Sequence, residues 1–413
     1  MNNKSILLAC ALSLGVASVA SGAVERISVT GPTAERHRAG KPVPRQTYQY
    51  VYVTGSTAAR SAFFNAVMNG STVFDSAPTA VTQQGKTQPG ATYMNFIGTL
   101  SGVSTIVKCH WSGSEAGLAD LYNGTEESFL IDDATTVLSS AAPAAANLIS
   151  SAVDICGADN NVVYSRSPGA AAFITGTETC IVPFKWEKEL GSAASLANVT
   201  DQSLRAALAG IATLSLFSGN PTDTNFVYVT GRNNQSGTRV NAFGDTGYGI
   251  FSAPFQLEVA TNGAMVVQVD GNILEDVGYS SGGSVAAQMG YSLDQSVNPA
   301  AVDIANGNGI EPYSVIAYLG IGDATTAEAN GATPLTYNGV AYSVTAVEQG
   351  QYNFWGNEYL YILNTASPQA FTVYTKLGPD GGVSANADGV TEINLNDMQV
   401  VRNGPTSDPL PKF

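Results

Sequence analysis

The sequence has very little histidine and few charged side chains. Only 2 of its 413 residues are histidine, and Asp, Glu, Lys and Arg together make up 12% of the chain. It contains no Gly-x-Ser-x-Gly motif and no group of carboxylates suited to a metal, so neither a serine hydrolase nor a metal-dependent hydrolase is indicated. We therefore expect a protein that is not an enzyme and that needs no cofactor.

Positive charge is scarce as well. Lys and Arg total 18 against 33 acidic residues, which gives a formal net charge of −15. A surface of that sign repels nucleic acids and anionic membranes, which argues against both as partners. An anionic ligand remains possible, because backbone N–H groups and one Arg can form a buried site while the outer surface stays acidic.

Cysteine is also rare. Three of the four cysteines, Cys109, Cys156 and Cys180, lie beyond the N-terminal segment, an odd number for an oxidising compartment. One disulfide and one free thiol are allowed, and the pairing cannot be read from the sequence. Cys109 precedes His110, but no second group of Cys or His completes a metal site, so this pair indicates a buried structural role.

Long apolar runs are confined to the N-terminus. Lys4 precedes the apolar stretch 6–20, and Ser21-Gly22-Ala23 offers the small residues that a signal peptidase recognises. The pattern predicts a signal peptide over residues 1–23 and a flexible, proline-rich leader over residues 24–45. No later segment approaches the ~20 apolar residues of a membrane helix. We expect an exported protein, either periplasmic or extracellular.

The rest of the chain repeats the order strand, turn, helix. Residues 48–54 alternate aromatic and β-branched side chains like a strand, and residues 58–68 carry apolar side chains at helical spacing. The same order recurs with strands at 104–109 and 225–230 and helices at 115–122 and from about 238. This alternation predicts an α/β fold with mainly parallel strands.

The length of the chain predicts more than one core. Roughly 390 residues remain after residue 23, more than a single core usually serves, so two lobes are expected. Residues 123–152 are rich in Ala, Ser and Thr and include an acidic patch. We interpret them as an inserted surface helix or another excursion from the fold.

Small hydroxyl residues stand where three of the predicted strands lead into helices. A helix N-terminus exposes unpaired N–H groups and about half a positive charge, so it attracts anions. Ser and Thr there either cap the helix or donate a hydroxyl to a bound oxygen. At the third junction Arg232 stands four residues before Ser236-Gly237-Thr238, and its planar fork of donors suits an oxyanion. The alternative is a surface turn with solvated arginines, and we expect Arg239, beyond the turn, to be solvated.

The pattern Arg232-x-x-x-Ser236-Gly237-Thr238 after a strand resembles the signature loop of the phosphate-binding proteins of ABC transporters, in which Arg, Ser, Gly and Thr contact the ligand. Other segments, from about residue 48 to 365, resemble further motifs of that family in the order that it requires. These segments are Thr54-Gly55-Ser56-Thr57, Gly113-Ser114-Glu115-Ala116-Gly117, Val153–Asp159, Thr200–Gly210 and Gly350–Leu360.

The resemblance implies an α/β, two-lobed type II periplasmic binding protein fold, with hinge strands and a cleft between the lobes. Lobe 1 would comprise residues 46–180 plus 351–413, and lobe 2 residues 181–350. Such a protein is a monomer that captures phosphate or a similar tetrahedral oxyanion and delivers it to an ABC transporter permease. The ligand-binding residues that the resemblance implies are Ser56, Thr57, Ser114, Asp159, Arg232, Ser236, Gly237 and Thr238.

Two positions depart from the family. Asp usually stands two residues after the signature Arg, where this sequence has Asn234. The turn at Asp159 is irregular, so either Asp159 or Asn160 occupies the place of the carboxylate that accepts the phosphate proton. The alternative function is a surface or matrix protein that kept the fold while its cleft lost or changed its ligand.

Overall fold

The computed structural model describes residues 47–259, 265–267, 277–293, 313–378, 382–402 and 409–412. The predicted signal peptide and leader, residues 1–23 and 24–45, lie outside the described residues. In the part that is described, no helix is long and apolar enough to cross a membrane.

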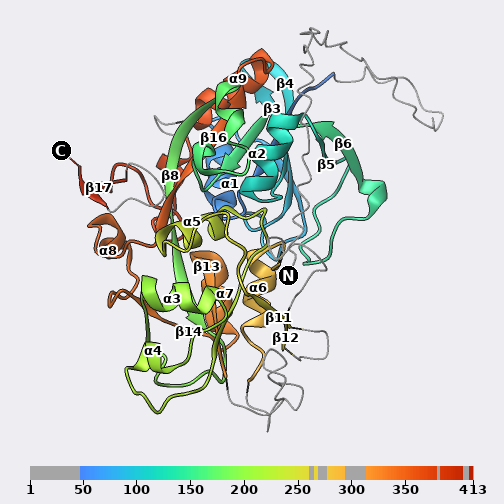
Figure 1. Cartoon of the computed structure of the whole chain (residues 1–413). Coiled ribbons are helices and arrows are strands. Elements are labelled where there is room, and N and C mark those ends of the chain that lie inside the picture. The colour runs from blue at the N-terminus through green and yellow to red at the C-terminus, as the bar shows by residue number, and fades with distance from the viewer. Residues whose placement is uncertain are drawn as a thin grey trace, which may run out of the picture. The chain divides into compact units, whose positions relative to one another are not determined.

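A large mixed sheet organises the described residues (Figure 1). Its strands follow the order β10-β13-β8-β16-β7-β1-β4-β3-β2, and β14 pairs with β8. Parallel pairing joins β1 to β4 and β7, and joins β10 to β13, while the other neighbours are antiparallel. The strands are β1 (Gln49–Gly55), β2 (Thr79–Gln83), β3 (Tyr93–Leu100), β4 (Val103–His110), β7 (Ile155–Ala158), β8 (Ile174–Lys188), β10 (Val227–Thr230), β13 (Ser314–Gly320), β14 (Thr333–Pro334) and β16 (Trp355–Leu363).

The helices connect these strands, as an α/β fold requires. They are α1 (Arg60–Met68), α2 (Ser114–Asn123), α3 (Asp201–Leu208), α4 (Ser215–Ser218), α5 (Gly237–Asp245), α6 (Gly282–Gln288), α7 (Ile321–Ala329), α8 (Val344–Glu348) and α9 (Pro368–Leu377). Each strand and helix expected from the three strand–turn–helix repeats is present, within a few residues of its predicted bounds. The α/β class is confirmed, but the expectation of mainly parallel strands was wrong, because most neighbouring strands of the large sheet pair antiparallel.

The long strand β8 belongs to two regions of the sheet. Its residues 174–183 pair with β16, and its residues 184–188 pair with β13. The chain thus passes within β8 from the region built by β1–β4 and β7 (the first sheet region) to the region built by β10, β13 and β14 (the second sheet region). It returns through β16. Two sheet regions joined by two crossing strands fit the predicted two-lobed fold class, whereas the residue bounds of the lobes stay a prediction.

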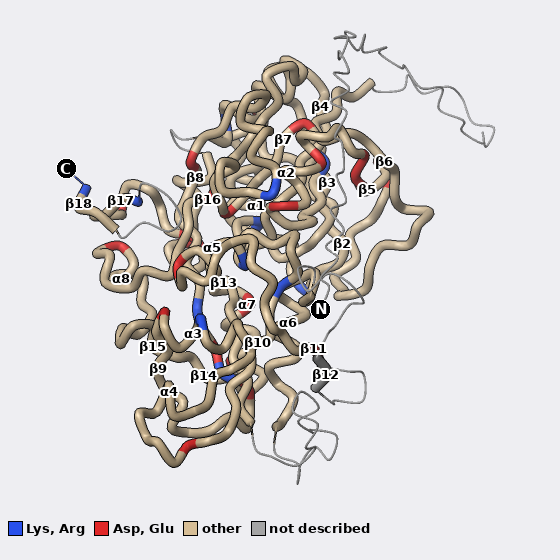
Figure 2. The backbone as a smooth tube through the Cα atoms, in the orientation of Figure 1, with Lys and Arg blue, Asp and Glu red and all other residues tan. Residues whose placement is uncertain are grey.

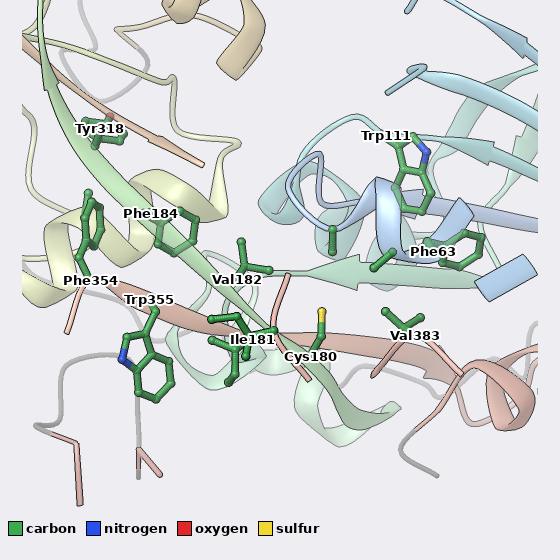
Figure 3. Packing of buried hydrophobic residues seen from close by; sticks show 14 of the residues in the cluster. Phe63, Trp111, Cys180, Ile181, Val182, Phe184, Tyr318, Phe354, Trp355 and Val383 are labelled. Atoms are coloured by element: carbon green, nitrogen blue, oxygen red, sulfur yellow. The ribbon is translucent and has the colours of Figure 1, made fainter. Parts of the chain in front are cut away.

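The apolar core follows the crossing strands. Figure 3 shows Cys180, Ile181, Val182 and Phe184 in succession along β8, all nearly or fully buried. One continuous cluster of buried side chains extends from them into both sheet regions, including Phe63 and Trp111 on one side and Tyr318 on the other. Burial of this apolar surface supplies the main stabilising free energy of the fold.

Residues 123–152 form a hairpin and not the helix that we had considered. Strands β5 (Glu126–Leu130) and β6 (Leu148–Ala152) pair antiparallel, with a single 3-10 turn at 145–147 before β6. Buried Lys108 of β4 holds the start of the loop between β5 and β6, because its Nζ donates to the Leu130 carbonyl at 2.5 Å and pairs with Asp132 at 2.9 Å. Asp132, one of the acidic residues of this segment, therefore forms an ion pair with the sheet.

The predicted structural role of the Cys109–His110 pair agrees with their contacts. The His110 ring stacks on Tyr93, and its Nδ1 lies 3.0 Å from a carboxylate oxygen of Glu127. Cys109, Cys156 and Cys180 are all buried and free, so the disulfide that the sequence allowed does not form. Burial raises the pKa of each thiol.

Charged positions are sparse along the chain, and most of the tube in Figure 2 is tan. Several carboxyl groups are nevertheless buried. Burial raises the pKa of Glu187, on β8, to about 8, and the charge of Glu328 adds to the effect. Burial likewise raises the pKa of Glu189 and of Glu358, on β16, well above the usual range. Burial therefore favours the protonated form of all three carboxyl groups in the folded chain.

We predict that the protein is most stable in weak acid. The folded chain keeps protons on Glu187, Glu189 and Glu358 that the unfolded chain releases above pH ~4.5, so stability falls as pH rises from there. Each such carboxyl lowers the free energy of unfolding by up to ~1.4 kcal/mol per pH unit, over the range where it is protonated in the folded chain and ionised in the unfolded chain. Urea unfolding between pH 5 and pH 9 measures this slope, and Glu187→Gln should flatten it up to about pH 8. A free energy of unfolding that rises over this range would contradict the assignment.

Candidate functional site

The predicted site residues lie where parallel strands end. β1, β4 and β7 run parallel and end at residues 55, 110 and 158, and the next residues along the chain include Ser56, Ser114 and Asp159. In the second sheet region, the loop after β10 carries Arg232 and leads into α5. Ligands of open α/β sheets bind outside the carboxyl ends of the strands, so this edge is the place to look for a site.

Asp159 joins two helix N-termini that come from different sheet regions. The Ser114 hydroxyl, at the first residue of α2, donates to Asp159 Oδ1, and Thr238 Oγ1, in the first turn of α5, donates to Asp159 Oδ2 at 3.2 Å. The backbone N–H of Asp159 also donates to Ser114 Oγ, at 3.2 Å. We call Ser114, Asp159, Gly237 and Thr238 the Asp159 cluster.

Gly237 allows this close approach. A Cβ at position 237 would lie 1.6 Å from Asp159 Oδ1 and 2.6 Å from Ser114 Oγ, both far inside contact distance. Only glycine therefore lets the first turn of α5 reach the carboxylate. The resemblance implies that Gly237 contacts an anionic ligand, and in this structure the group beside it is the side chain of Asp159.

Two helix N-termini meet at the cluster. α2 and α5 direct the positive ends of their dipoles at Asp159, and the two hydroxyls add hydrogen bonds to its charged form. Burial raises the pKa of Asp159, and the Ser114 bond, the charge of Arg232 and the Thr238 bond oppose that rise. Asp159 is only 2% exposed, so any ligand that replaces its contacts must enter a closed cluster.

Other carboxyl groups surround the cluster. Glu115 follows Ser114 on α2, and burial raises its pKa to about 7. Burial and the charge of Asp159 raise the pKa of the Glu358 carboxyl group, and its hydrogen bond with the Ser56 hydroxyl opposes that rise. With several acids close together, a proton acceptor is available at this site, and additional negative charge is disfavoured.

Arg232 is buried beside the cluster, and its guanidinium bonds to backbone carbonyls. Its Nε donates to the Tyr279 carbonyl at 3.2 Å, and its Nη2 to the Ser280 carbonyl at 2.9 Å. Burial lowers its pKa, while the charges of Asp323 and Asp159 oppose this. The guanidinium therefore supplies positive potential to the cluster from a fixed position.

The expectation that Arg239 is solvated was wrong. Its side chain is 3% exposed, its Nη1 donates to the carbonyls of Val277 at 3.2 Å and Arg232 at 3.4 Å, and its guanidinium stacks over Phe243. Because these contacts come from a distant segment and from the following turn of α5, Arg239 has a structural role in holding the signature loop.

The remaining predicted residues lie near the cluster with other contacts. Ser236 accepts the N–H of Arg239 at 3.3 Å and so caps α5. Ser56 accepts the N–H of Ala58 at 3.2 Å. The Asn160 amide donates to Glu115 at 2.7 Å, so Asp159, and not Asn160, contacts the two helix N-termini. Thr57 lies on the wall of a cavity of about 330 Å³ that Asp159 does not line.

The sequence analysis missed Asn241. Its Nδ2 donates to the Asp159 carbonyl at 2.6 Å and to the Gly237 carbonyl at 3.1 Å. Asn241 thus fixes the backbone of Asp159 to α5. The signal was its place one helical turn after Gly237, on the same face of the helix.

The chain is similar to known proteins in fold and not in sequence. No family model and no curated protein matches the chain. In fold, however, it is similar to solved phosphate-binding proteins of ABC transporters. One is a putative phosphate ABC transporter substrate-binding protein from Clostridium perfringens with bound phosphate, with 11% identity, a TM-score of 0.48, and coverage of 84% of this chain and 100% of that chain.

Two further structures are of the same kind. An ABC-type phosphate transport receptor from Vibrio cholerae has 13% identity and a TM-score of 0.41, covering 80% of this chain and 93% of that chain. PstS from Borrelia burgdorferi has 12% identity and a TM-score of 0.40, covering 84% and 98%. The three identities lie between 11% and 13%, and the three TM-scores lie below 0.5.

We predict that Gly237→Ala destabilises the protein, because the added methyl group forces α5 and Asp159 apart. Overpacking of this kind costs ~1–3 kcal/mol. Thermal or urea unfolding measures the loss. Gly283→Ala in α6 is the matched control, since its Cβ would meet nothing closer than 3.9 Å and alanine suits a helix better than glycine. Equal effects of the two substitutions would contradict the close approach at Gly237.

Proposed function

We propose that this chain is an exported solute-binding protein that captures phosphate or a similar tetrahedral oxyanion and passes it to an ABC transporter permease. The observation that supports this proposal most is the meeting of α2 and α5 at Asp159. One helix comes from each sheet region, so a ligand held by both would lie between the predicted lobes, residues 46–180 plus 351–413 and residues 181–350. The protein would act by binding alone and not as an enzyme.

The groups of the cluster suit a protonated oxyanion. Ser114 and Thr238 have hydroxyl donors, the two helix N-termini and Arg232 provide positive potential, and Asp159 is an acceptor for one proton. Monohydrogen phosphate carries such a proton at neutral pH, whereas sulfate does not. A carboxylate facing sulfate would place lone pairs against each other with no proton between them, so the cluster should prefer phosphate.

Ligand entry requires the cluster to open. The space beside Asp159, lined also by Asn160, Asn241 and Asn357, is about 20 Å³, which is enough for about one water molecule. Because α2 and α5 belong to different sheet regions, separating these regions would free the two hydroxyls for a ligand. In the proposed cycle, phosphate then replaces the carboxylate oxygens as their acceptor, and Asp159 receives the ligand's proton.

The closed cluster also favours a second candidate function. A carboxylate of the chain already satisfies both hydroxyls, as a bound anion would. A surface or matrix protein that had kept the fold and lost its ligand would show the same contacts. Isothermal titration calorimetry with inorganic phosphate separates the two functions, because only the solute-binding protein gives a saturable heat.

We predict that Arg232→Ala weakens phosphate binding by ~2–3 kcal/mol, because a buried cation beside the anion is lost. Calorimetry measures the change, and urea unfolding of the same variant checks that the fold persists. Arg239→Ala is the comparison. Since Arg239 stabilises the loop through Val277 and Phe243, its loss should lower stability more than the intrinsic affinity. Unchanged phosphate affinity in folded Arg232→Ala would contradict the proposed site.

We also predict that Asp159→Asn narrows the preference for phosphate over sulfate. An amide can donate to a sulfate oxygen, which the carboxylate cannot. Asn234 stands where the family has an acidic partner for the signature Arg, so the site is more positive and the starting preference should be moderate. Competition binding of phosphate, arsenate and sulfate at neutral pH measures the preference for phosphate in the unaltered protein and in the variant. Sulfate binding as tightly as phosphate in the unaltered protein would place Asp159 outside the site.

A further inference from the structure

A cavity of about 330 Å³ lies between the N-termini of α1 and α7, and Asp159 does not line it. Its walls combine residues of both sheet regions, among them Thr57, Arg60 and Ser61 from the first and Ile321 and Asp323 from the second. Lys86, from the loop between β2 and β3, completes one side. Thr57 is one of the ligand residues that the resemblance implies, but no residue of the Asp159 cluster lines this space.

The cavity carries net positive charge. Arg60 and Lys86 line it against a single lining carboxylate, Asp323, and none of the ion pairs between described residues includes either cation. α1 and α7 each contain nine residues and have no side-chain cap at their N-termini, so the positive ends of two dipoles add to the potential. Buried Glu392 accepts one N–H of α1, that of Ala62, at 3.3 Å, and does not line the cavity.

The size of the cavity sets the size of the ligand. Small-molecule sites have volumes of ~300–1,000 Å³, so this cavity falls within that range, whereas the 20 Å³ beside Asp159 does not. Inorganic phosphate alone would leave most of the cavity to water. The walls are also rich in hydroxyls, including Thr57, Ser61 and Thr326, which suit a ligand with hydroxyl groups of its own.

We propose that this cavity binds a small hydroxylated phosphomonoester, with its phosphoryl group toward Arg60 and Lys86 and its hydroxyl groups toward Asp323. The two cations and the N-terminus of α1 match the charge of a phosphoryl dianion. The carboxylate of Asp323 accepts hydrogen bonds from the hydroxyls of the ligand and disfavours a second anionic group there. The proposal goes beyond the phosphate site at Asp159 and does not depend on it.

Calorimetry with glycerol 3-phosphate as the probe tests the proposal on the purified chain. The unaltered protein should bind glycerol 3-phosphate more tightly than inorganic phosphate at this cavity and should not bind glycerol. Arg60→Gln and Lys86→Gln should each weaken glycerol 3-phosphate binding about tenfold or more, since each removes a charged partner. Lys376→Gln in α9 makes the same charge change outside the cavity lining and should leave the affinity unchanged.

Each outcome decides one of the two proposals. Absent binding of glycerol 3-phosphate, or binding that Arg60→Gln and Lys86→Gln leave unchanged, overturns the cavity proposal. If glycerol binds as tightly as glycerol 3-phosphate, the cavity does not select an anionic ligand, and the proposed phosphomonoester class is wrong. Glycerol 3-phosphate binding that depends on Lys86, with no response to inorganic phosphate, supports the cavity and contradicts only the phosphate site. Lys86 is exposed on a loop, so its variant decides the question even where Arg60→Gln fails to fold.

Discussion

The pair of hydrogen bonds that Asp159 accepts from Ser114 and Thr238 is the constraint on which the site depends. These bonds join α2 of the first sheet region to α5 of the second through a single buried carboxylate. Burying a carboxylate costs free energy unless it is well hydrogen-bonded. The two hydroxyls and the two helix N-termini offset the desolvation cost of Asp159. Any anion that enters must offer these donors an equally good acceptor.

The crossing strands put the two helices within reach of each other. β8 pairs with β16 over one part of its length and with β13 over the rest, so both sheet regions share one strand and one apolar core (Figure 3). The segments that follow β1, β4 and β7 therefore face those that follow β10 and β13. A small rotation about the crossing strands would change the distance between α2 and α5, which is the movement that the proposed ligand entry requires.

The sequence predicted the features that depend on neighbouring residues. The strand–turn–helix order placed Ser114, Gly237 and Thr238 at helix N-termini, and the geometry agrees. It could not predict the burial of Arg239, because Val277 and Phe243 provide the contacts, nor that the chain's own carboxylate occupies the cluster. The cavity was missed because Arg60, Lys86 and Asp323 come from three separate segments that only the folded sheet brings together.

A crystal structure of the protein grown with saturating inorganic phosphate tests the central claim most directly. The account predicts a phosphate whose oxygens accept the hydroxyls of Ser114 and Thr238, with Arg232 beside it and Asp159 bonded to the ligand through a shared proton. A structure in which Asp159 still holds both hydroxyls, with no phosphate between α2 and α5, would contradict it.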